Sequence, residues 1–175
     1  MALALETALY QSPIGPLRLV EEAGGPLIVE FPGRSTRVRW TVRVKGATPA
    51  IEVQEGGCDQ TRALLDAYFD GRARPFRYPR RLARWFDPSP AMIAVHRAIC
   101  RIPFGSTRSY ADIARQTGLH PRLVGQLVGA NNLAILVPCH RVVGKRGELV
   151  GYGGGLTRKR WLLAHEERHV GLVLR

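Results

Sequence analysis

Hydrophobic and polar residues follow different rhythms in the two halves of the chain. In the first half, residues 37–44 alternate strictly between apolar and polar, which predicts a strand with one buried face. Residues 17–20 and 27–31 are shorter strand candidates, separated by a Gly-Gly-Pro turn. Residues 59–70 carry an apolar stripe at helical spacing and end before a glycine. This half therefore predicts a small antiparallel sheet with one helix.

Residues 72–90 form a stretch of different character. They contain four prolines and six arginines, which argues against a helix over most of their length. We interpret the stretch as a connector between two domains. The predicted N-terminal α/β domain, which includes most of the connector, is residues 1–85, and the C-terminal domain is residues 86–175.

The second half is predicted to be mainly helical, with helices at residues 91–102, 110–117 and 121–130 and a last helix after Thr157. Ser109 can cap the second of these helices, and Pro121 suits the first position of the third. Helix, short glycine-containing turn and helix together favour a helix-turn-helix. The fold class is therefore α+β, a small N-terminal sheet and helix domain followed by a mainly helical domain.

Positive charge is concentrated in the second half. The net charge is +12 and the sequence pI is about 10.8. Residues 1–85 carry 13 basic and 9 acidic residues, whereas residues 86–175 carry 13 basic and 5 acidic ones. A clustered positive field favours binding to a polyanion such as nucleic acid, although a basic soluble surface can also bind nothing specific.

The three cysteines, Cys58, Cys100 and Cys139, are odd in number and widely spaced. They match neither a disulfide framework nor a zinc ribbon. A reducing, cytoplasmic location is the simplest expectation. No long apolar run and no signal-like N-terminus occur in the sequence, so we expect no membrane association and no secretion.

Cys139 has the surroundings of a reactive thiol. The apolar run 133–137 leads to Pro138 and Cys139, and His140 and Arg141 follow. A base or a cation next to a thiol favours the thiolate, although a core cysteine at the end of a strand is the commoner role. A Cys–His pair needs a third group to orient the imidazole, and the candidate acids in this half are Glu148, Glu166 and Glu167. Structural roles are the simpler interpretation for Cys58 and Cys100.

The run Pro138-Cys139-His140-Arg141-Val142-Val143 resembles the active-site signature of the O6-alkylguanine-DNA alkyltransferases, or methylated-DNA–protein-cysteine methyltransferases. Other matches to this family follow its order over roughly residues 90–167: Ile102-Pro103-Phe104-Gly105, Ser109-Tyr110, Arg122-Leu123-Val124-Gly125, Asn131, Gly151-Tyr152, Gly154-Gly155-Leu156 and Trp161-Leu162-Leu163-Ala164-His165-Glu166. The first half is similar only around residues 12–17.

The resemblance implies a catalytic set. Cys139 would be the alkyl acceptor, and His140 would remove its proton through a water. Glu166 would orient His140, and Asn131 would brace the turn before the active-site strand. Tyr110 would rotate the damaged nucleotide outward and donate a proton to the leaving guanine.

The resemblance also implies how DNA is bound. Arg122 would fill the gap left by the flipped base, with further DNA contacts at Ser109, Tyr110 and Gly125. A substrate pocket is implied at Val137, Val142, Tyr152, Gly153 and Gly154. Gly153 departs from the family, in which many members carry a serine near the alkylated oxygen.

The implied activity is single-turnover DNA repair of O6-alkylguanine in double-stranded DNA, with O4-alkylthymine as a second candidate substrate. We expect a monomer that uses no cofactor and, because Cys58 is the only cysteine before Cys100, no zinc. Three alternative functions fit the sequence less well. A sensor of alkylated DNA would lack Cys139, and a helix-turn-helix regulator would not need the Pro-Cys-His run. The signatures of another cysteine enzyme, such as a hydrolase, do not fit.

Overall fold

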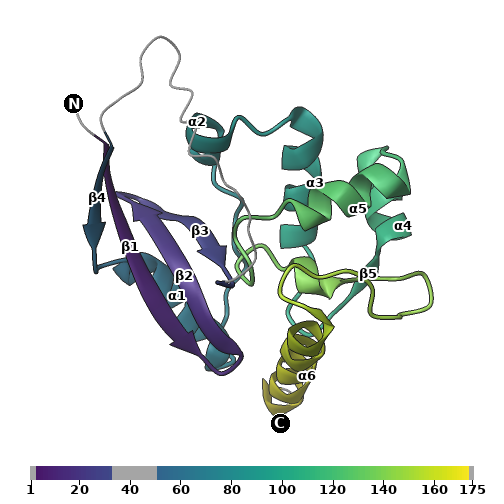
Figure 1. The fold of residues 1–175 in the computed structure, drawn as a ribbon. Helices are drawn as coiled ribbons and strands as arrows, with labels where there is room; N and C mark the ends of the chain where they lie inside the picture. The colour runs from purple at the N-terminus through teal and green to yellow at the C-terminus, as the bar shows by residue number, and fades with distance from the viewer. Residues whose placement is uncertain (1–2, 33–50, 174–175) are drawn as a thin grey trace.

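A computed structural model describes residues 3–32 and 51–173, in which a β-sheet is followed by a group of helices (Figure 1). The N-terminal half holds β1 (Leu3–Ser12), β2 (Gly15–Glu22), β3 (Gly25–Glu30), β4 (Ile51–Glu55) and α1 (Asp59–Phe69). The rest of the described chain holds α2 (Leu82–Phe86), α3 (Pro90–Cys100), β5 (Arg108–Ser109), α4 (Tyr110–Thr117), α5 (Pro121–Gly129), the 3-10 turn η1 (Cys139–Arg141), β6 (Val142–Val143) and α6 (Leu156–Val173). This order confirms the predicted α+β class.

The four-stranded sheet has the order β3-β2-β1-β4. β1 pairs antiparallel with β2, and β2 pairs antiparallel with β3, so the strands predicted at residues 17–20 and 27–31 are confirmed. The expectation of an antiparallel sheet was wrong for β4, which lies parallel to β1 at the edge. The hydrophobic pattern does not predict β1, because the strand carries apolar residues at exposed positions such as Leu9 as well as at buried positions such as Leu5. Apolar and polar residues therefore do not alternate along it. The strand predicted at residues 37–44 lies outside the described residues.

The two halves share one continuous core. Buried side chains of the sheet, α1, α3 and α6 belong to a single hydrophobic cluster. Backbone hydrogen bonds add to it: the N–H of Val29 donates to the carbonyl of Asn132 at 2.8 Å, and the N–H of Ala134 donates to the carbonyl of Val29 at 2.9 Å. These two hydrogen bonds hold β3 against the segment that precedes Cys139. The division into domains at residue 85 stays a prediction, and it would cut α2.

The helix-turn-helix is built by local sequence signals. Ser109 caps α4 in a capping box with Asp112, and the two side chains satisfy otherwise unpaired N–H groups. Gly118 ends α4 with a φ of 70°, a left-handed conformation that favours glycine. His120 caps α5, and Pro121 occupies its first turn. These features confirm the two predicted helices and the turn between them.

The segment before Cys139 and the start of the last helix differ from what the sequence predicts. Residues 133–137 form turns rather than a strand: Ile135 has a φ of 72°, and the N–H of Val137 donates to the carbonyl of Leu133 at 2.9 Å. Five consecutive buried apolar residues give the same sequence pattern in a series of turns as in a strand that is buried on both faces. The pattern alone therefore does not distinguish the two. The last helix, expected after Thr157, begins at Leu156 and continues to Val173, so Glu166 lies in the body of α6.

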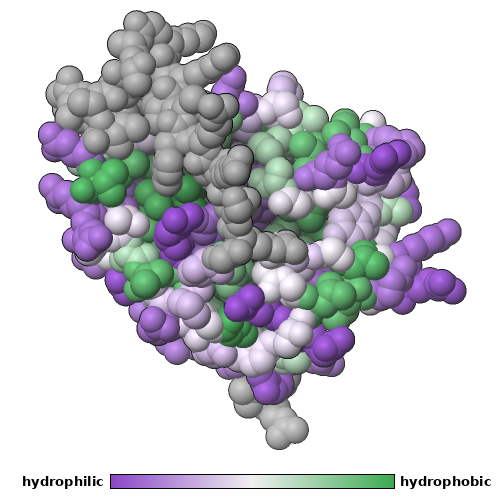
Figure 2. All heavy atoms as spheres, in the orientation of Figure 1, coloured by the Kyte–Doolittle hydropathy of each residue, from purple (hydrophilic) through white to green (hydrophobic). Residues whose placement is uncertain are grey.

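No helix in residues 3–32 or 51–173 is both long and apolar enough to cross a membrane. On the face shown in Figure 2, hydrophobic residues are scattered among hydrophilic ones.

Candidate active site

Cys139 begins η1 and is 8 % exposed. Asn131 holds the turn around it: its Nδ2 donates to the carbonyl of Val137 at 2.9 Å and to Sγ of Cys139 at 3.1 Å, while its Oδ1 accepts from the N–H of Leu133 at 3.0 Å. The structure thus brings Asn131 and Cys139 together, and the amide both shapes the turn and donates to the sulfur.

His140 is fully buried beside Glu166. Its Nε2 lies 2.6 Å from Oε1 of Glu166, and both side chains are 0 % exposed. A carboxylate only accepts hydrogen bonds, so this contact places the imidazole proton on Nε2. Nδ1 is buried and has no hydrogen-bond partner among the described residues. Burial lowers the pKa of His140, with Glu166 opposing that shift, so the ring is a neutral base with a lone pair on Nδ1.

Glu166 is the centre of a buried network that draws on four parts of the chain. Its carboxylate accepts a two-pronged contact from Arg141 at 2.9–3.1 Å, the hydroxyl of Tyr68 at 2.9 Å and the N–H of Gly105 at 2.9 Å. Burial alone would raise the pKa of Glu166, but the contacts with His140 and Arg141 outweigh it and lower the pKa to about 2. Glu166 therefore stays charged and fixes the orientation of His140.

Gly105 can serve in this network because it has no side chain. Its φ is +75°, and a Cβ there would lie 2.3 Å from the side chain of Val170. The turn after α3 can therefore approach α6 closely enough for its N–H to reach Glu166.

The thiol of Cys139 is subject to opposing influences. Burial raises its pKa, whereas the hydrogen bond from Asn131 and the charge of Lys159 lower it, and the net direction is upward. Lys159 is fully buried, and its Nζ donates to the carbonyls of Val142 at 2.6 Å, Val150 at 2.8 Å and Gly151 at 3.3 Å. A resting thiol of this kind needs a base in order to react, and His140 is the predicted base.

Two tyrosines border the thiol. Burial, and secondarily the charge of Cys139, raise the pKa of Tyr110 and of Tyr152, so both hydroxyls keep their protons. Tyr110 begins α4, and its hydroxyl donates to the carbonyl of Val150 at 3.5 Å. Tyr152 packs edge-on against Phe31, with ring centroids 6.2 Å apart. The structure therefore places both predicted tyrosines near the predicted acceptor.

The predicted DNA-binding residues lie on the helix-turn-helix. Arg122 is exposed in the first turn of α5, and a Cβ added at Gly125 of the same helix would meet open space. Ser109 is half-buried and engaged in capping α4. Arg122 therefore stands apart from the buried network, as a residue that acts on DNA rather than on the thiol would.

The predicted pocket residues differ in which of their backbone groups are already hydrogen-bonded within the protein. The carbonyl of Val137 accepts from Asn131 and from the N–H of Cys139, and the carbonyl of Val142 accepts from Lys159. At Gly154, a Cβ would lie 2.5 Å from the ring of Phe31, so only glycine fits this packing. Gly153 lies in a turn of the same loop. The roles of these residues toward a base stay predictions.

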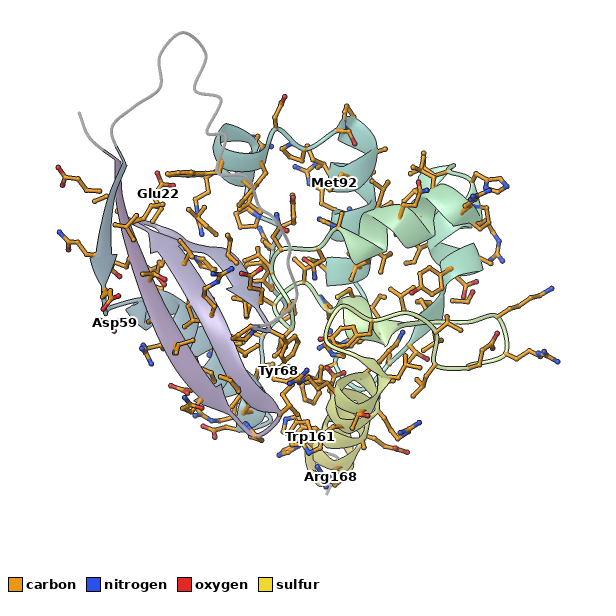
Figure 3. All side chains as sticks on the ribbon, viewed as in Figure 1. Glu22, Asp59, Tyr68, Met92, Trp161 and Arg168 are labelled. Carbon is orange, nitrogen blue, oxygen red and sulfur yellow. The ribbon has the colours of Figure 1, made fainter. Side chains whose placement is uncertain are left out.

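Three members of the site do not stand out in the sequence. Tyr68 is one of several apolar-stripe residues in its helix, Arg141 is simply a cation that follows His140, and Lys159 has no distinguishing signal. Tyr68 lies where the N-terminal half meets α6 (Figure 3). A buried tyrosine or lysine has the same sequence signature as an exposed one, so only the folded chain identifies these roles.

Comparison with known proteins agrees with this geometry. Residues 90–168 match the family model described as 6-O-methylguanine DNA methyltransferase, DNA binding domain. The methylated-DNA–protein-cysteine methyltransferase of Mycolicibacterium paratuberculosis is 38 % identical over 94 % of both chains, and that of Mycobacterium bovis is 41 % identical over 89 % of this chain and 88 % of its own. A crystal structure of Mycobacterium tuberculosis OGT in complex with DNA superposes with a TM-score of 0.73 at 33 % identity, covering 94 % of each chain. With a Cys–His–Glu centre beside a helix-turn-helix and this similarity along nearly its whole length, the chain belongs to the methylated-DNA–protein-cysteine methyltransferase family.

Proposed function

We propose that Cys139 takes the alkyl group from O6 of a guanine in double-stranded DNA and keeps it. The observation that carries the proposal is the fixed order of groups behind the thiol: a neutral His140, whose Nε2 is bound by the buried carboxylate of Glu166. O4-alkylthymine is a second candidate substrate, because its alkyl group is also bonded to an exocyclic oxygen. The protein acts as a monomer on DNA.

The reaction begins with transfer of the Cys139 proton to Nδ1 of His140 through a bridging water. The imidazolium that forms is stabilised by Glu166, which is held in place by Arg141. The thiolate is stabilised by the Nδ2 hydrogen bond from Asn131 and by the charge of Lys159. Formation of the thiolate therefore depends on His140 being held where it can accept the proton of Cys139.

The thiolate then attacks the alkyl carbon. The S–C bond forms as the C–O6 bond breaks, and the bonding electrons pass to the guanine. Tyr110, whose raised pKa keeps its hydroxyl protonated until this point, donates a proton to an oxygen or ring nitrogen of the leaving guanine. The imidazolium of His140 then returns the Cys139 proton to the tyrosinate, so that the net proton transfer is from Cys139 to the guanine. The thioether product has no leaving group that the site could expel, so each molecule reacts once.

The damaged base must leave the duplex to reach Cys139. Unstacking costs a few kcal/mol. Arg122 at the start of α5 offsets part of this cost by filling the gap, and the open surface at Gly125 lets the helix approach the groove closely. Ser109 contributes to backbone contacts at the start of α4.

Mass spectrometry of the protein after incubation with O6-methylguanine duplex tests the proposal. We expect a gain of one methyl group (~14 Da), localised to Cys139 by peptide mapping. Cys58 and Cys100 are internal controls, because burial raises their pKa values to about 11 and about 12, and they should stay unmodified. DNA binding with an unmodified Cys139 would instead indicate a binding module without chemistry.

A further inference from the structure

A second basic site lies behind the catalytic network. A cavity of about 1060 Å³ opens between the connector that follows α1 and the C-terminal end of α3. Residues 72–80 of the connector form much of its lining, and Pro138 and Arg141 form part of its inner wall. Figure 1 shows the connector passing from the end of α1 toward α2. The cavity is at the upper end of the size range of small-molecule sites.

The lining of the cavity is strongly positive. Six exposed arginines contribute to it: Arg72, Arg74, Arg77, Arg80, Arg97 and Arg101. Arg72 pairs with Asp70, but the other five have no ion pair with any residue of the described chain. No acidic side chain of residues 3–32 or 51–173 lines the cavity. Like charges gathered around one opening repel each other, and a bound anion would relieve this repulsion.

Aromatic rings lie among the arginines. Phe76, Tyr78 and Phe104 are half-buried in the lining, and the guanidinium of Arg141 lies 5.5 Å from the ring centroid of Phe104. Guanidinium groups match phosphate oxygens, and flat rings provide surfaces on which bases stack. An acidic peptide would satisfy the charges but would leave the rings unused.

We propose that this cavity binds a phosphodiester strand of nucleic acid, with arginines on the phosphates and aromatic rings against the bases. Among the residues that the structure describes, the lining includes neither Cys139 nor Tyr110 nor Arg122. The cavity is therefore distinct from the surface that presents damaged DNA to the thiol, and one molecule can hold two segments of nucleic acid. The strand can be a single-stranded part of the DNA under repair or a separate molecule.

The test measures binding of a fluorescent, undamaged oligothymidylate of about 12 nucleotides, within the range bound by known single-strand sites. The protein carries Arg122→Glu to weaken the helix-turn-helix surface. In this background, the triple change Arg74→Gln, Arg77→Gln and Arg101→Gln should raise the Kd by about tenfold or more. The salt dependence of log K should become shallower by about 2, as expected for three lost phosphate contacts on a single strand.

A matched triple variant removes the same charge elsewhere. Arg62→Gln, Arg160→Gln and Arg168→Gln change residues outside the cavity, of which Arg160 and Arg168 are exposed and Arg62 is half-buried. Arg168 lies toward the far end of α6 (Figure 3). This variant should keep the Kd within about twofold, since removing distant charges changes a screened field only slightly. An equal rise of the Kd in both triple variants would overturn the proposal, because binding of the oligothymidylate would then depend only on the net charge of the protein.

Three further arms identify the ligand. An abasic strand of equal length should bind more weakly than oligothymidylate, and equal affinity would overturn the role of the rings. Poly-glutamate that binds as tightly as oligothymidylate would indicate an acidic protein partner and overturn the nucleic acid assignment.

A duplex with a single-stranded overhang identifies the source of the strand. If it binds more tightly than either part alone, the strand in the cavity belongs to the DNA under repair. If the duplex and the single strand bind independently, the cavity holds a separate molecule.

The reaction of the cavity triple with free O6-benzylguanine separates this proposal from the repair function. The rate should be unchanged relative to the unmodified protein, because none of the three arginines contacts Cys139, His140 or Glu166 in the structure. Loss of this reaction together with loss of strand binding would show that the changes disturb the active site, and would overturn an independent site.

Discussion

The hydroxyl of Tyr68 in α1 donates a 2.9 Å hydrogen bond to Oε1 of Glu166 in α6, the same oxygen that lies 2.6 Å from Nε2 of His140. Tyr68 is 3 % exposed and Glu166 is 0 % exposed. The N-terminal half of the chain thus reaches directly into the network behind Cys139. This contact lets that half help to position Glu166 against His140, the proposed base, as well as contribute to packing.

Changing Tyr68→Phe should destabilise the fold and slow alkyl transfer. The loss of a hydrogen bond to a charged group costs about 1.5–3 kcal/mol of unfolding free energy, measurable by urea denaturation. The transfer rate should fall because Glu166 loses one of the groups that fix it against His140.

Tyr10→Phe is the matched control for this change. It removes a hydroxyl that donates to Asp66 at 2.7 Å, within the same half but away from Glu166. It should lower stability without changing the transfer rate at temperatures where both proteins are folded. Equal transfer rates for the two variants would show that Tyr68 has only a structural role.

Changing Arg122→Ala should slow repair of duplex DNA more than reaction with free O6-benzylguanine. The free base needs no flipping, whereas the duplex loses the side chain that offsets unstacking. The measurement compares rate constants for the two substrates, with Arg115→Ala on α4 as the control because Arg115 is held by Asp112. Equal losses on both substrates would argue against an insertion role.

Changing Lys159→Met should disorder the loop over Cys139. Three carbonyls, those of Val142, Val150 and Gly151, would lose their shared donor in a buried site. We expect a loss of about 2–4 kcal/mol in unfolding free energy and a slower transfer rate. Lys145→Met, at an exposed position in the loop before Glu148, is the control and should change neither. Faster hydrogen exchange confined to residues 142–151 would locate the effect.

Acid should destabilise the protein through the buried pair. The pKa of Glu166 is lowered from 4.5 to about 2, so its contribution to stability is complete above pH 4.5 and is lost as the pH falls toward 2. This loss is on the order of 3 kcal/mol. The pKa of His140 is also lowered, from 6.5, so its protonation in the unfolded chain lowers stability in the same direction below that pH.

Urea denaturation at several pH values checks this expectation. Glu166→Gln should flatten the dependence between pH 4.5 and 2, whereas Glu167→Gln, which changes an exposed neighbour, should leave it as it was. An unchanged pH dependence in Glu166→Gln would show that the acid sensitivity arises elsewhere.

The sequence by itself determined the features that depend on local signals. The capping residue Ser109, the turn at Gly118 and Pro121 in the first turn of α5 predict the helix-turn-helix, since each acts within a few residues of its own position. The Pro138-Cys139-His140 run likewise predicted the reactive thiol. These features needed no knowledge of distant contacts.

Tertiary structure alone decided how the thiol is supported. The parallel pairing of β4 with β1, the turns at residues 133–137, and the convergence of Tyr68, Arg141 and Lys159 all depend on segments far apart in the chain. A buried polar side chain is stable only where partners from elsewhere satisfy it, and a sequence does not display those partners. The family resemblance in the sequence therefore predicted Cys139 together with His140, Glu166 and Asn131. The contributions of Tyr68, Arg141 and Lys159 to the network became apparent only in the folded chain.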